Sequence, residues 1–99
     1  MRIVESEDMI SVEVDGVAKA VLSFYTESDV CYVTKTYVDA SLRGQGIASK
    51  LMDALIEKAR RDGFKIKPIC SYAASYFEKH PESNDLLALR EYLYNEFLG

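Results

Sequence analysis

Two glycines, one residue apart, stand directly before a helical pattern in residues 41–55, SLRGQGIASKLMDAL. Glycine carries no Cβ, so Gly44 and Gly46 let a ligand approach the bare backbone. The first N–H groups of a helix lack internal partners, and together they carry about half a positive charge. Arg43 adds a full positive charge beside them. This combination is typical of a site for phosphate-type anions.

Two familiar phosphate-binding loops do not fit this stretch. A P-loop has Gly-Lys-Ser or Gly-Lys-Thr where its helix begins, whereas Ile47 follows Gly46 here. A dinucleotide-binding fingerprint needs a third glycine, where this chain has Ser49, and a repeated strand–helix–strand unit. A Gly-x-Gly pair alone is a weak signal, so a flexible loop with a glycine at the helix start remains the alternative interpretation.

Length and charge narrow the possible partners. The chain has 99 residues and a formal net charge of −4, which predicts a single domain over residues 1–99 and argues against nucleic acid as a partner. Residues 43–67 hold seven basic and three acidic residues, a net +4, so the remainder carries −8. The basic stretch could mark an anion site, or it could be a solvated helix face.

The chain shows no sign of a membrane span, a secretory signal or a metal site. No apolar run approaches the roughly 20 residues that cross a bilayer, and residues 1–8 are acidic, without a signal-peptide core. Cys31 and Cys70 make no disulfide framework, and with His80 as the single histidine they make no zinc set. We therefore expect a soluble, cytoplasmic, metal-free protein without membrane contacts, and a monomer.

The elements that must position the glycines follow from periodicity and turn residues. Alternating residues on both sides of Asp15-Gly16 predict a hairpin, and a β-branched and aromatic run predicts a long central strand. A stripe at i, i+4 steps predicts a helix that ends at Gly63. A helix between the third and fourth strands predicts one parallel crossover in an otherwise antiparallel sheet, hence a mixed α/β fold. The expected elements are strands 9–14, 18–26, 30–38 and 64–68 and helices 46–62, 70–80 and 86–98.

Two motifs of the chain resemble those of a known family. The run Arg43-Gly44-Gln45-Gly46-Ile47-Ala48 matches the R/Q-x-x-G-x-G/A signature of the GNAT acetyltransferases, between a long strand and an amphipathic helix. A second stretch, CSYAASYFEKHPE at residues 70–82, is similar to the minimal YjdJ-type branch, whose members carry a C-S-Y…H-P-E signature. The resemblance covers about residues 30–85.

The resemblance implies a GNAT-like fold, a mostly antiparallel sheet that splays open, with acetyl-coenzyme A as co-substrate. The six residues of the first motif, Arg43, Gly44, Gln45, Gly46, Ile47 and Ala48, would hold its pyrophosphate, and Lys50 would reach its 3′-phosphate. Tyr37 and Val38 would run beside the pantetheine arm, and strand 64–68 would splay away so that the gap holds the thioester. Pro68 has no N–H to pair, which suits a splayed strand.

The chain departs from the family pattern on the acceptor side. Ordinary members have one or two helices after their first strand, for which the first hairpin here leaves no room. Their last two strands are replaced by the predicted helix 86–98, so we expect an open, shallow acceptor side. Members often carry a catalytic tyrosine in an L/F-Y-E-K stretch, but alignment on Glu78-Lys79 places Phe77 there and Tyr76 one residue early.

Three side chains on residues 70–80 are candidates for catalysis. Cys70 lies at a predicted helix start, where a thiolate is favoured, and could carry a covalent acetyl group; the alternative is a small buried hydrophobe. His80 could act as a base or simply complement the helix C-terminus, and ten helical residues place it about 15 Å from Cys70. Tyr76, with Tyr72 four residues before it on the same face, could line the thioester slot or simply pack. Cys31, inside a strand, is expected to be core.

The leading hypothesis is an acetyltransferase that moves acetyl from acetyl-coenzyme A to an amine of a small molecule or an exposed protein segment. The alternative is a non-catalytic acyl-coenzyme A binding module. Both hypotheses require the same cofactor site, so cofactor binding cannot choose between them.

Overall fold

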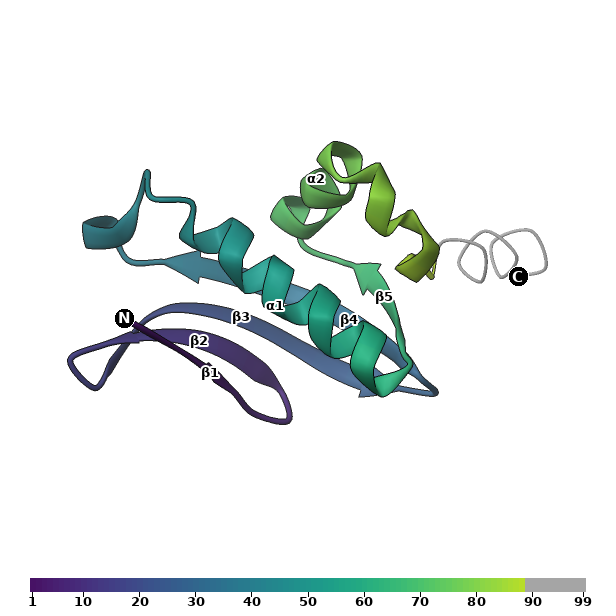
Figure 1. The fold of residues 1–99 in the computed structure, drawn as a ribbon, viewed down its shortest axis with the longest axis horizontal. Helices are drawn as coiled ribbons and strands as arrows, with labels where there is room; N and C mark the ends of the chain where they lie inside the picture. Colours follow the sequence, from purple (N-terminus) through teal and green to yellow (C-terminus); the bar gives the residue numbers. More distant parts are fainter. Residues whose placement is uncertain (89–99) are drawn as a thin grey trace.

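A computed structural model describes residues 1–88 of the chain, and it contains a five-stranded sheet with helices packed against it (Figure 1). The strand order follows the chain order, β1 to β5. The first four strands are antiparallel, and β5 is parallel to β4 because α1 makes the crossover between them. The elements are β1 (Arg2–Glu5), β2 (Met9–Val14), β3 (Val17–Glu27), β4 (Val30–Val38), α1 (Ile47–Asp62), β5 (Lys65–Pro68) and α2 (Ser71–Lys79), with short 3-10 helices η1 (Ala40–Leu42) and η2 (Pro81–Leu86).

The predicted central elements are confirmed, and their turns have the expected conformation. Asp15 and Gly16 both have positive φ, 52° and 79°, as the tight hairpin turn between β2 and β3 requires. Ser28 and Asp29, in the turn between β3 and β4, also have positive φ, 51° and 62°. These turns are encoded locally, and they set the register of the antiparallel part of the sheet.

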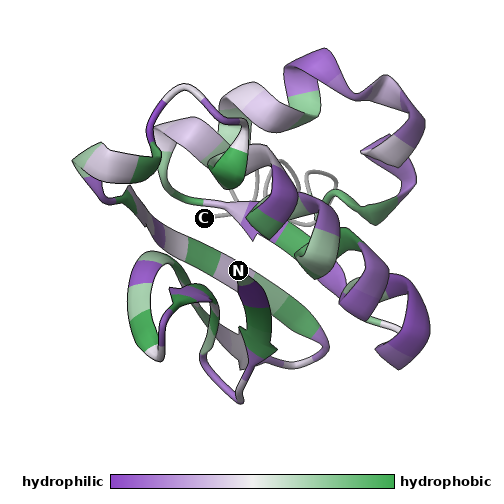
Figure 2. Cartoon of the chain, turned by 60° about the vertical axis from the view of Figure 1, so that its left-hand side comes forward, coloured by the Kyte–Doolittle hydropathy of each residue, from purple (hydrophilic) through white to green (hydrophobic). Residues whose placement is uncertain are grey.

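The core lies between the sheet and the apolar stripe of α1. Hydrophobic and hydrophilic residues alternate along this helix in Figure 2. The side chains that α1 buries are Ile47, Leu51, Met52, Leu55, Ile56 and Ala59. They meet inward side chains of the central strands, among them Leu22 and Val33, each 0% exposed. Gly63, with φ of 79°, ends the helix as predicted, and its N–H donates to the carbonyl of Ala59.

The first strand was not predicted. Residues 2–5 pair with β2 at the edge of the sheet, although three of these four residues are exposed. The short, acidic N-terminal segment shows little alternation, so only pairing with β2 reveals the strand. An edge strand of four residues is common where a sheet must limit its free edge.

The strands β4 and β5 separate halfway along β4. Pairing runs from Val30–Lys65 to Val33–Pro68, and then the N–H groups of Ile69 and Cys70 both donate to the Val33 carbonyl, at 2.9 and 3.0 Å. At the same place the register between β3 and β4 shifts, which leaves Thr34 without a partner residue in β3 and bends the strand. All of β5, Pro68 included, pairs with β4, so the predicted strand 64–68 does not itself splay away. The opening lies beyond the end of β5, between residues 34–38 and the chain from Ile69 onward.

The prediction of a helix from Leu86 onward is wrong for its first residues. Leu86 ends η2, Leu87 forms a parallel bridge with Ile66, and the N–H of Ala88 donates to the Ile66 carbonyl at 2.9 Å. The open edge of β5 offers backbone groups that capture this segment in an extended form. The rest of the predicted helix, residues 89–98, lies outside the described residues. None of the helices in residues 1–88 has the length and apolar character needed to cross a membrane.

Candidate functional site

The loop from β4 to α1 is held in place by its own polar side chains. The carboxylate of Asp39 accepts hydrogen bonds from the backbone N–H and the hydroxyl of Ser41, and these bonds lower the pKa of Asp39. Arg43 Nε donates to the carbonyl of Val38 at 3.2 Å, and Gln45 Nε2 donates to the carbonyl of Ser41 at 3.4 Å. The loop is therefore shaped by local contacts.

The two glycines leave the start of α1 open. Gly44 and Gly46 have φ of 81° and 70°, a left-handed conformation that other residues rarely adopt, and Gly46 is the N-cap without any side-chain cap. Within residues 1–88, the first helical N–H with a partner belongs to Lys50, which donates to the Gly46 carbonyl at 3.1 Å. The N–H groups of residues 47–49 precede that bond, and a Cβ built on Gly46 meets no atom within 4 Å. This geometry fits the pyrophosphate predicted for the site.

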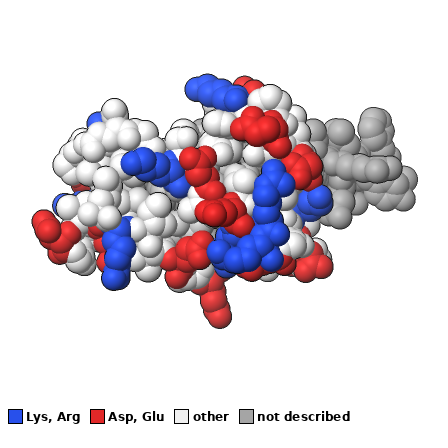
Figure 3. Space-filling model, in the orientation of Figure 1, with Lys and Arg blue, Asp and Glu red and all other residues white. Residues whose placement is uncertain are grey.

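The basic residues of 43–67 do not form one cationic patch. Lys58 pairs with Asp62 at 3.1 Å, Arg60 with Asp85 at 2.8 Å and Arg61 with Glu5 at 3.3 Å. Figure 3 shows basic and acidic side chains side by side over this part of the molecule. The solvated-face interpretation therefore holds for the C-terminal half of α1, whereas Lys50 lies exposed on its first turn.

Cys70 lies where β4 and β5 separate, which is where the sequence placed it. It is the N-cap of α2, it is half-buried, and its Sγ lies 3.5 Å from Thr36 Oγ1 on β4. Beyond Val33 no strand pairs with β4 on the β5 side within the described chain, so Thr36 and Val38, whose backbone groups point away from β3, direct them toward this slot. Thr36 was missed by the sequence reasoning, although strand alternation from Val38 could have placed it on the same face.

The other cysteine is structural. Cys31 is 0% exposed within the core, and burial raises the pKa of its thiol to about 12. A thiol held neutral in this way is a poor nucleophile, which confirms the core assignment.

The two tyrosines of α2 meet α1. The hydroxyl of Tyr76 donates to Asp53 Oδ1 at 2.6 Å, and burial together with this acceptor strongly raises the pKa of Tyr76. Burial also raises the pKa of Tyr72, and the side chain of Ser49 partly offsets that effect. Tyr72 therefore lies close to the first turns of α1, beside the open helix start. Ser49 and Asp53 were not identified from the sequence, because only packing brings them to α2.

His80 is far from Cys70 along the helix. It is the C-cap of α2 while Cys70 is the N-cap, so the two side chains lie at opposite ends. Its ring stacks on Tyr76, with 4.1 Å between centroids, and its Nδ1 lies 3.0 Å from Glu82 Oε2. These contacts favour a role in fixing the end of α2.

The last two predicted positions lie at the end of β4. Val38 packs against the core, and the adjacent Tyr37 is 47% exposed, so its side chain lies on the opposite face of the sheet. The backbone groups of Tyr37 face Val21 of β3, because Asp39 and Lys19, two residues along, form a hydrogen-bonded pair. Tyr37 therefore presents neither its ring nor its backbone to the slot, contrary to the prediction.

Comparisons with known proteins agree with this geometry. A family model described as GCN5-related N-acetyl-transferase matches residues 9–86. The uncharacterized N-acetyltransferase YjgM of Escherichia coli K12 is 35% identical over 68 residues, which are 69% of this chain; the chain spans about a third of that relative (36%).

Solved structures give the same result. A solution structure of a GCN5-like protein from Staphylococcus aureus aligns with a TM-score of 0.70 and 27% identity, over 87% of this chain and 86% of that one. The ribosomal-protein-alanine N-acetyltransferase of Brucella melitensis aligns with a TM-score of 0.59 and 26% identity, over 72% of this chain and 59% of that one.

Proposed function

Because this chain belongs to the GCN5-related N-acetyltransferase family, we propose that it moves the acetyl group of acetyl-coenzyme A to an amine. The acceptor amine lies on a small molecule or on an exposed protein segment. We also place the chain in the minimal YjdJ-type branch, on the C-S-Y…H-P-E signature. One observation carries the proposal: Cys70 lies against β4 in the slot that opens beside residues 34–38, and β4 leads directly into the open N-terminus of α1.

The cofactor path runs from the slot beside residues 34–38 to the N-terminus of α1. Different residues along it bind different parts of acetyl-coenzyme A. The N–H groups at the start of α1 bind the pyrophosphate, assisted by Arg43, and Lys50 reaches the 3′-phosphate. The N–H of Val38, which points away from β3, hydrogen-bonds a pantetheine amide, as a neighbouring strand would. Tyr72, between α1 and α2, closes the path on its helix side.

We assign the nucleophile to Cys70. Its thiol loses a proton to solvent, its sulfur attacks the carbonyl carbon of the bound thioester, and the bond from that carbon to the sulfur of coenzyme A breaks. Coenzyme A takes up a proton from solvent and leaves as the thiol. The Thr36 hydroxyl lies 3.5 Å from the Cys70 sulfur and can donate a hydrogen bond that stabilises the thiolate before attack. The neutral acceptor amine then attacks the carbonyl carbon of acetyl-Cys70, its nitrogen loses a proton as the amide forms, the carbon–sulfur bond breaks, and the cysteine sulfur takes up a proton to return to the thiol.

Tyr76 and His80, which the sequence suggested as proton-transfer groups, serve in this proposal to hold α2. The Tyr76 hydroxyl is engaged by Asp53, and a raised pKa makes it a weaker acid toward a departing thiolate. His80 stacks on Tyr76 at the far end of α2 from Cys70. Both residues therefore act on the position of Cys70 through the helix.

Acetylation of the protein itself tests the role of Cys70. Incubation with acetyl-coenzyme A is expected to add one acetyl group, detected by mass spectrometry, and hydroxylamine is expected to remove it as a thioester. Cys70→Ala should abolish the label while calorimetry shows nearly unchanged affinity for acetyl-coenzyme A. Cys31→Val is the matched control, because it removes the other thiol and should leave the label in place.

The outcomes separate the parts of the proposal. A label that survives in Cys70→Ala would remove Cys70 as nucleophile and leave direct attack by the amine. Absence of binding in the unmodified chain would refute the cofactor site. Binding without labelling, and without release of coenzyme A across a panel of amines and peptides, would refute the transferase activity.

A further inference from the structure

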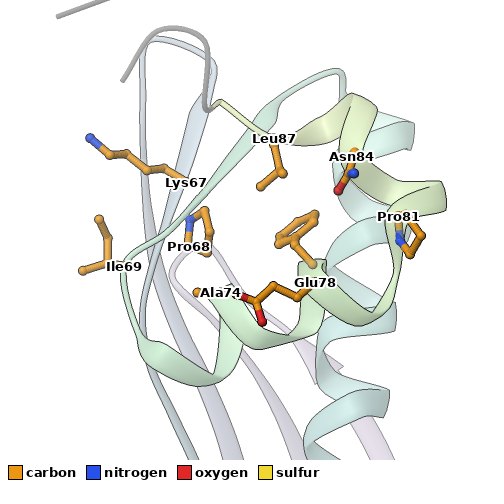
Figure 4. A pocket seen from close by; sticks show the side chains of 9 residues that line it. Lys67, Pro68, Ile69, Ala74, Glu78, Pro81, Asn84 and Leu87 are labelled. Carbon is orange, nitrogen blue, oxygen red and sulfur yellow. The ribbon is translucent and has the colours of Figure 1, made fainter. Parts of the chain in front are cut away.

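The two faces of the sheet differ in what covers them. The helices α1 and α2 lie together on one face, where the Tyr76 hydroxyl on α2 donates to Asp53 on α1. Beside α2 on that face, a hollow of about 630 Å³ has Pro68, Phe77 and Leu87 among its lining residues (Figure 4). The opposite face, which we call the outer face, is left without a helix in the described chain (Figure 2), and several of its large side chains are exposed.

Alternation along the strands identifies the outer-face side chains. Leu22 of β3 is 0% exposed in the core, so Val21 and Ser23 on either side of it point outward. The register of β3, β4 and β5 adds the residues opposite them, and Figure 4 shows the Lys67 side chain directed away from Leu87. The outer face of these three strands comprises Val21, Ser23, Tyr25, Tyr32, Lys35, Tyr37 and Lys67.

Aromatic rings are exposed at both ends of the outer face. Tyr25 and Tyr37 are 49% and 47% exposed. Tyr37 lies opposite Val21, four residues from Tyr25 along β3, which separates the two tyrosines by about 13 Å along the strand. Tyr25 stacks on Tyr32 with 4.8 Å between the ring centroids and 10° between the planes, and Lys67 Nζ lies 5.6 Å from the Tyr32 centroid. Tyr32 covers only one face of the Tyr25 ring, so the other face belongs to the exposed half of this residue.

The charge of this part of the sheet is opposite in sign to that of the whole chain. Strands β3, β4 and β5 carry four lysines and one glutamate, a net charge of +3, whereas the chain has a net charge of −4. A bound ligand senses mainly the charges within a Debye length, about 8 Å at physiological ionic strength, so the local charge is the relevant one. The charged residues of the three strands are Lys19, Glu27, Lys35, Lys65 and Lys67.

Lys35 lies between the two aromatic ends of the outer face. It pairs in register with Ser23, two residues from Tyr25 on β3, and it is two residues from Tyr37 on β4. Its side chain is exposed and makes no hydrogen bond or ion pair with another residue of the described chain. An ammonium group is therefore available between two exposed rings.

We propose that the outer face binds a single strand of nucleic acid. One base stacks on Tyr25, a second contacts Tyr37, and the phosphates between them lie at Lys35. Bases stack on aromatic side chains largely irrespective of sequence, and cations beside the rings bind the phosphate backbone. An open sheet with exposed aromatic residues binds about two or three bases in this way in other folds. An acidic polypeptide would match the lysines but not the rings, and the inference does not depend on acetyl transfer.

Fluorescence anisotropy of a labelled oligouridylate of about eight nucleotides, titrated with the full chain, tests the binding. Backbone amide chemical shifts are expected to change at Ser23, Tyr25 and Lys35, and not in α1 or α2. The logarithm of the affinity should fall with the logarithm of the salt concentration, with a slope of about −0.7 for each phosphate contacted. A duplex of the same length should bind more weakly, because its bases already stack on one another.

Two pairs of variants assign the binding to the outer face. Tyr25→Val removes the ring but keeps a good strand former, and it should weaken binding about fivefold or more, whereas Tyr25→Phe keeps the ring and should bind as the parent does. Lys35→Ala should weaken binding and reduce the magnitude of the salt slope by about 0.7. Lys79→Ala removes the same charge from the exposed end of α2 and should leave the slope unchanged. Thermal melting followed by circular dichroism checks that each variant is folded.

The proposal is overturned if the oligouridylate shifts no amide of the outer face, or if Tyr25→Val binds it as the parent does. Equally tight binding of polyglutamate would make the face a site for acidic polypeptides instead. A dimer in sedimentation that is lost in Tyr25→Val, together with no oligouridylate binding, would make it a contact between two copies of the chain. Displacement of the oligouridylate by acetyl-coenzyme A would place it at the start of α1 and also overturn the proposal. A chain that binds the oligouridylate but not acetyl-coenzyme A refutes the proposed function alone.

Discussion

Replacing Gly46 with alanine separates backbone strain from loss of the anion site. Gly46 has φ of 70° and ψ of 22°, and an alanine Cβ there meets no protein atom within 4 Å. The substitution therefore causes no clash within the protein. Its cost is the left-handed conformation, about 1 kcal/mol for an L-residue. For a domain of this size, that lowers Tm by roughly 4–8 °C.

Gly16 is the matched control. It has φ of 79°, its Cβ would also meet nothing within 4 Å, and it lies in the β2–β3 hairpin. Gly16→Ala and Gly46→Ala should therefore lower Tm, measured by circular dichroism, by similar amounts.

Only Gly46→Ala should weaken acetyl-coenzyme A binding in titration calorimetry. The new methyl group would fill space that is open beside the start of α1, where a bound phosphate oxygen must come within about 2.9 Å of nitrogen. Loss of one hydrogen bond to a charged group is worth about 1.5–3 kcal/mol, which is roughly a 10- to 150-fold weaker affinity. Affinity within twofold of the parent, or an equal loss in Gly16→Ala, would refute the placement of the pyrophosphate.

Three further outcomes follow from the contacts of the site. In the folded chain, iodoacetamide at pH 8 should modify Cys70 and leave the buried Cys31 intact, whereas both should react in guanidinium; modification of Cys31 first would contradict its placement in the core. Burial raises the pKa of Cys31 to about 12 in the folded state, whereas the thiol of the unfolded chain ionises near its ordinary pKa of 9.0. The free energy of unfolding should therefore fall above pH 9, by up to about 1.4 kcal/mol per pH unit. Cys31→Val should flatten that slope in urea titrations at pH 8 and 10, and an unchanged slope would exclude the thiol as its cause. Tyr76→Phe should cost about 1 kcal/mol through its lost bond to Asp53, yet retain acetyl transfer; loss of transfer with unchanged affinity would make Tyr76 the proton donor after all.

The cofactor half of the molecule could be predicted from the sequence because its signals are local. Alternation defined β2, the Asp15-Gly16 turn defined the return into β3, a β-branched and aromatic run defined β4, and the i, i+4 stripe defined α1. Gly44 and Gly46 occupy backbone conformations that few other residues tolerate, so their spacing already indicated an open helix start. In each case a residue and its near neighbours in the chain carry the physical cause.

The remaining features depend on which distant segments meet, and only the tertiary structure decided them. Residues 2–5 become a strand because β2 offers an edge, and Leu87 is extended because β5 offers one, against the helical prediction from Leu86. Thr36 reaches Cys70 only because β4 and β5 separate after Val33. Likewise, Pro68, Phe77 and Leu87 line one hollow although they belong to three different segments of the chain. Chain periodicity reports which face of an element is buried, but the identity of the residue on the opposite element depends on packing between segments far apart in sequence.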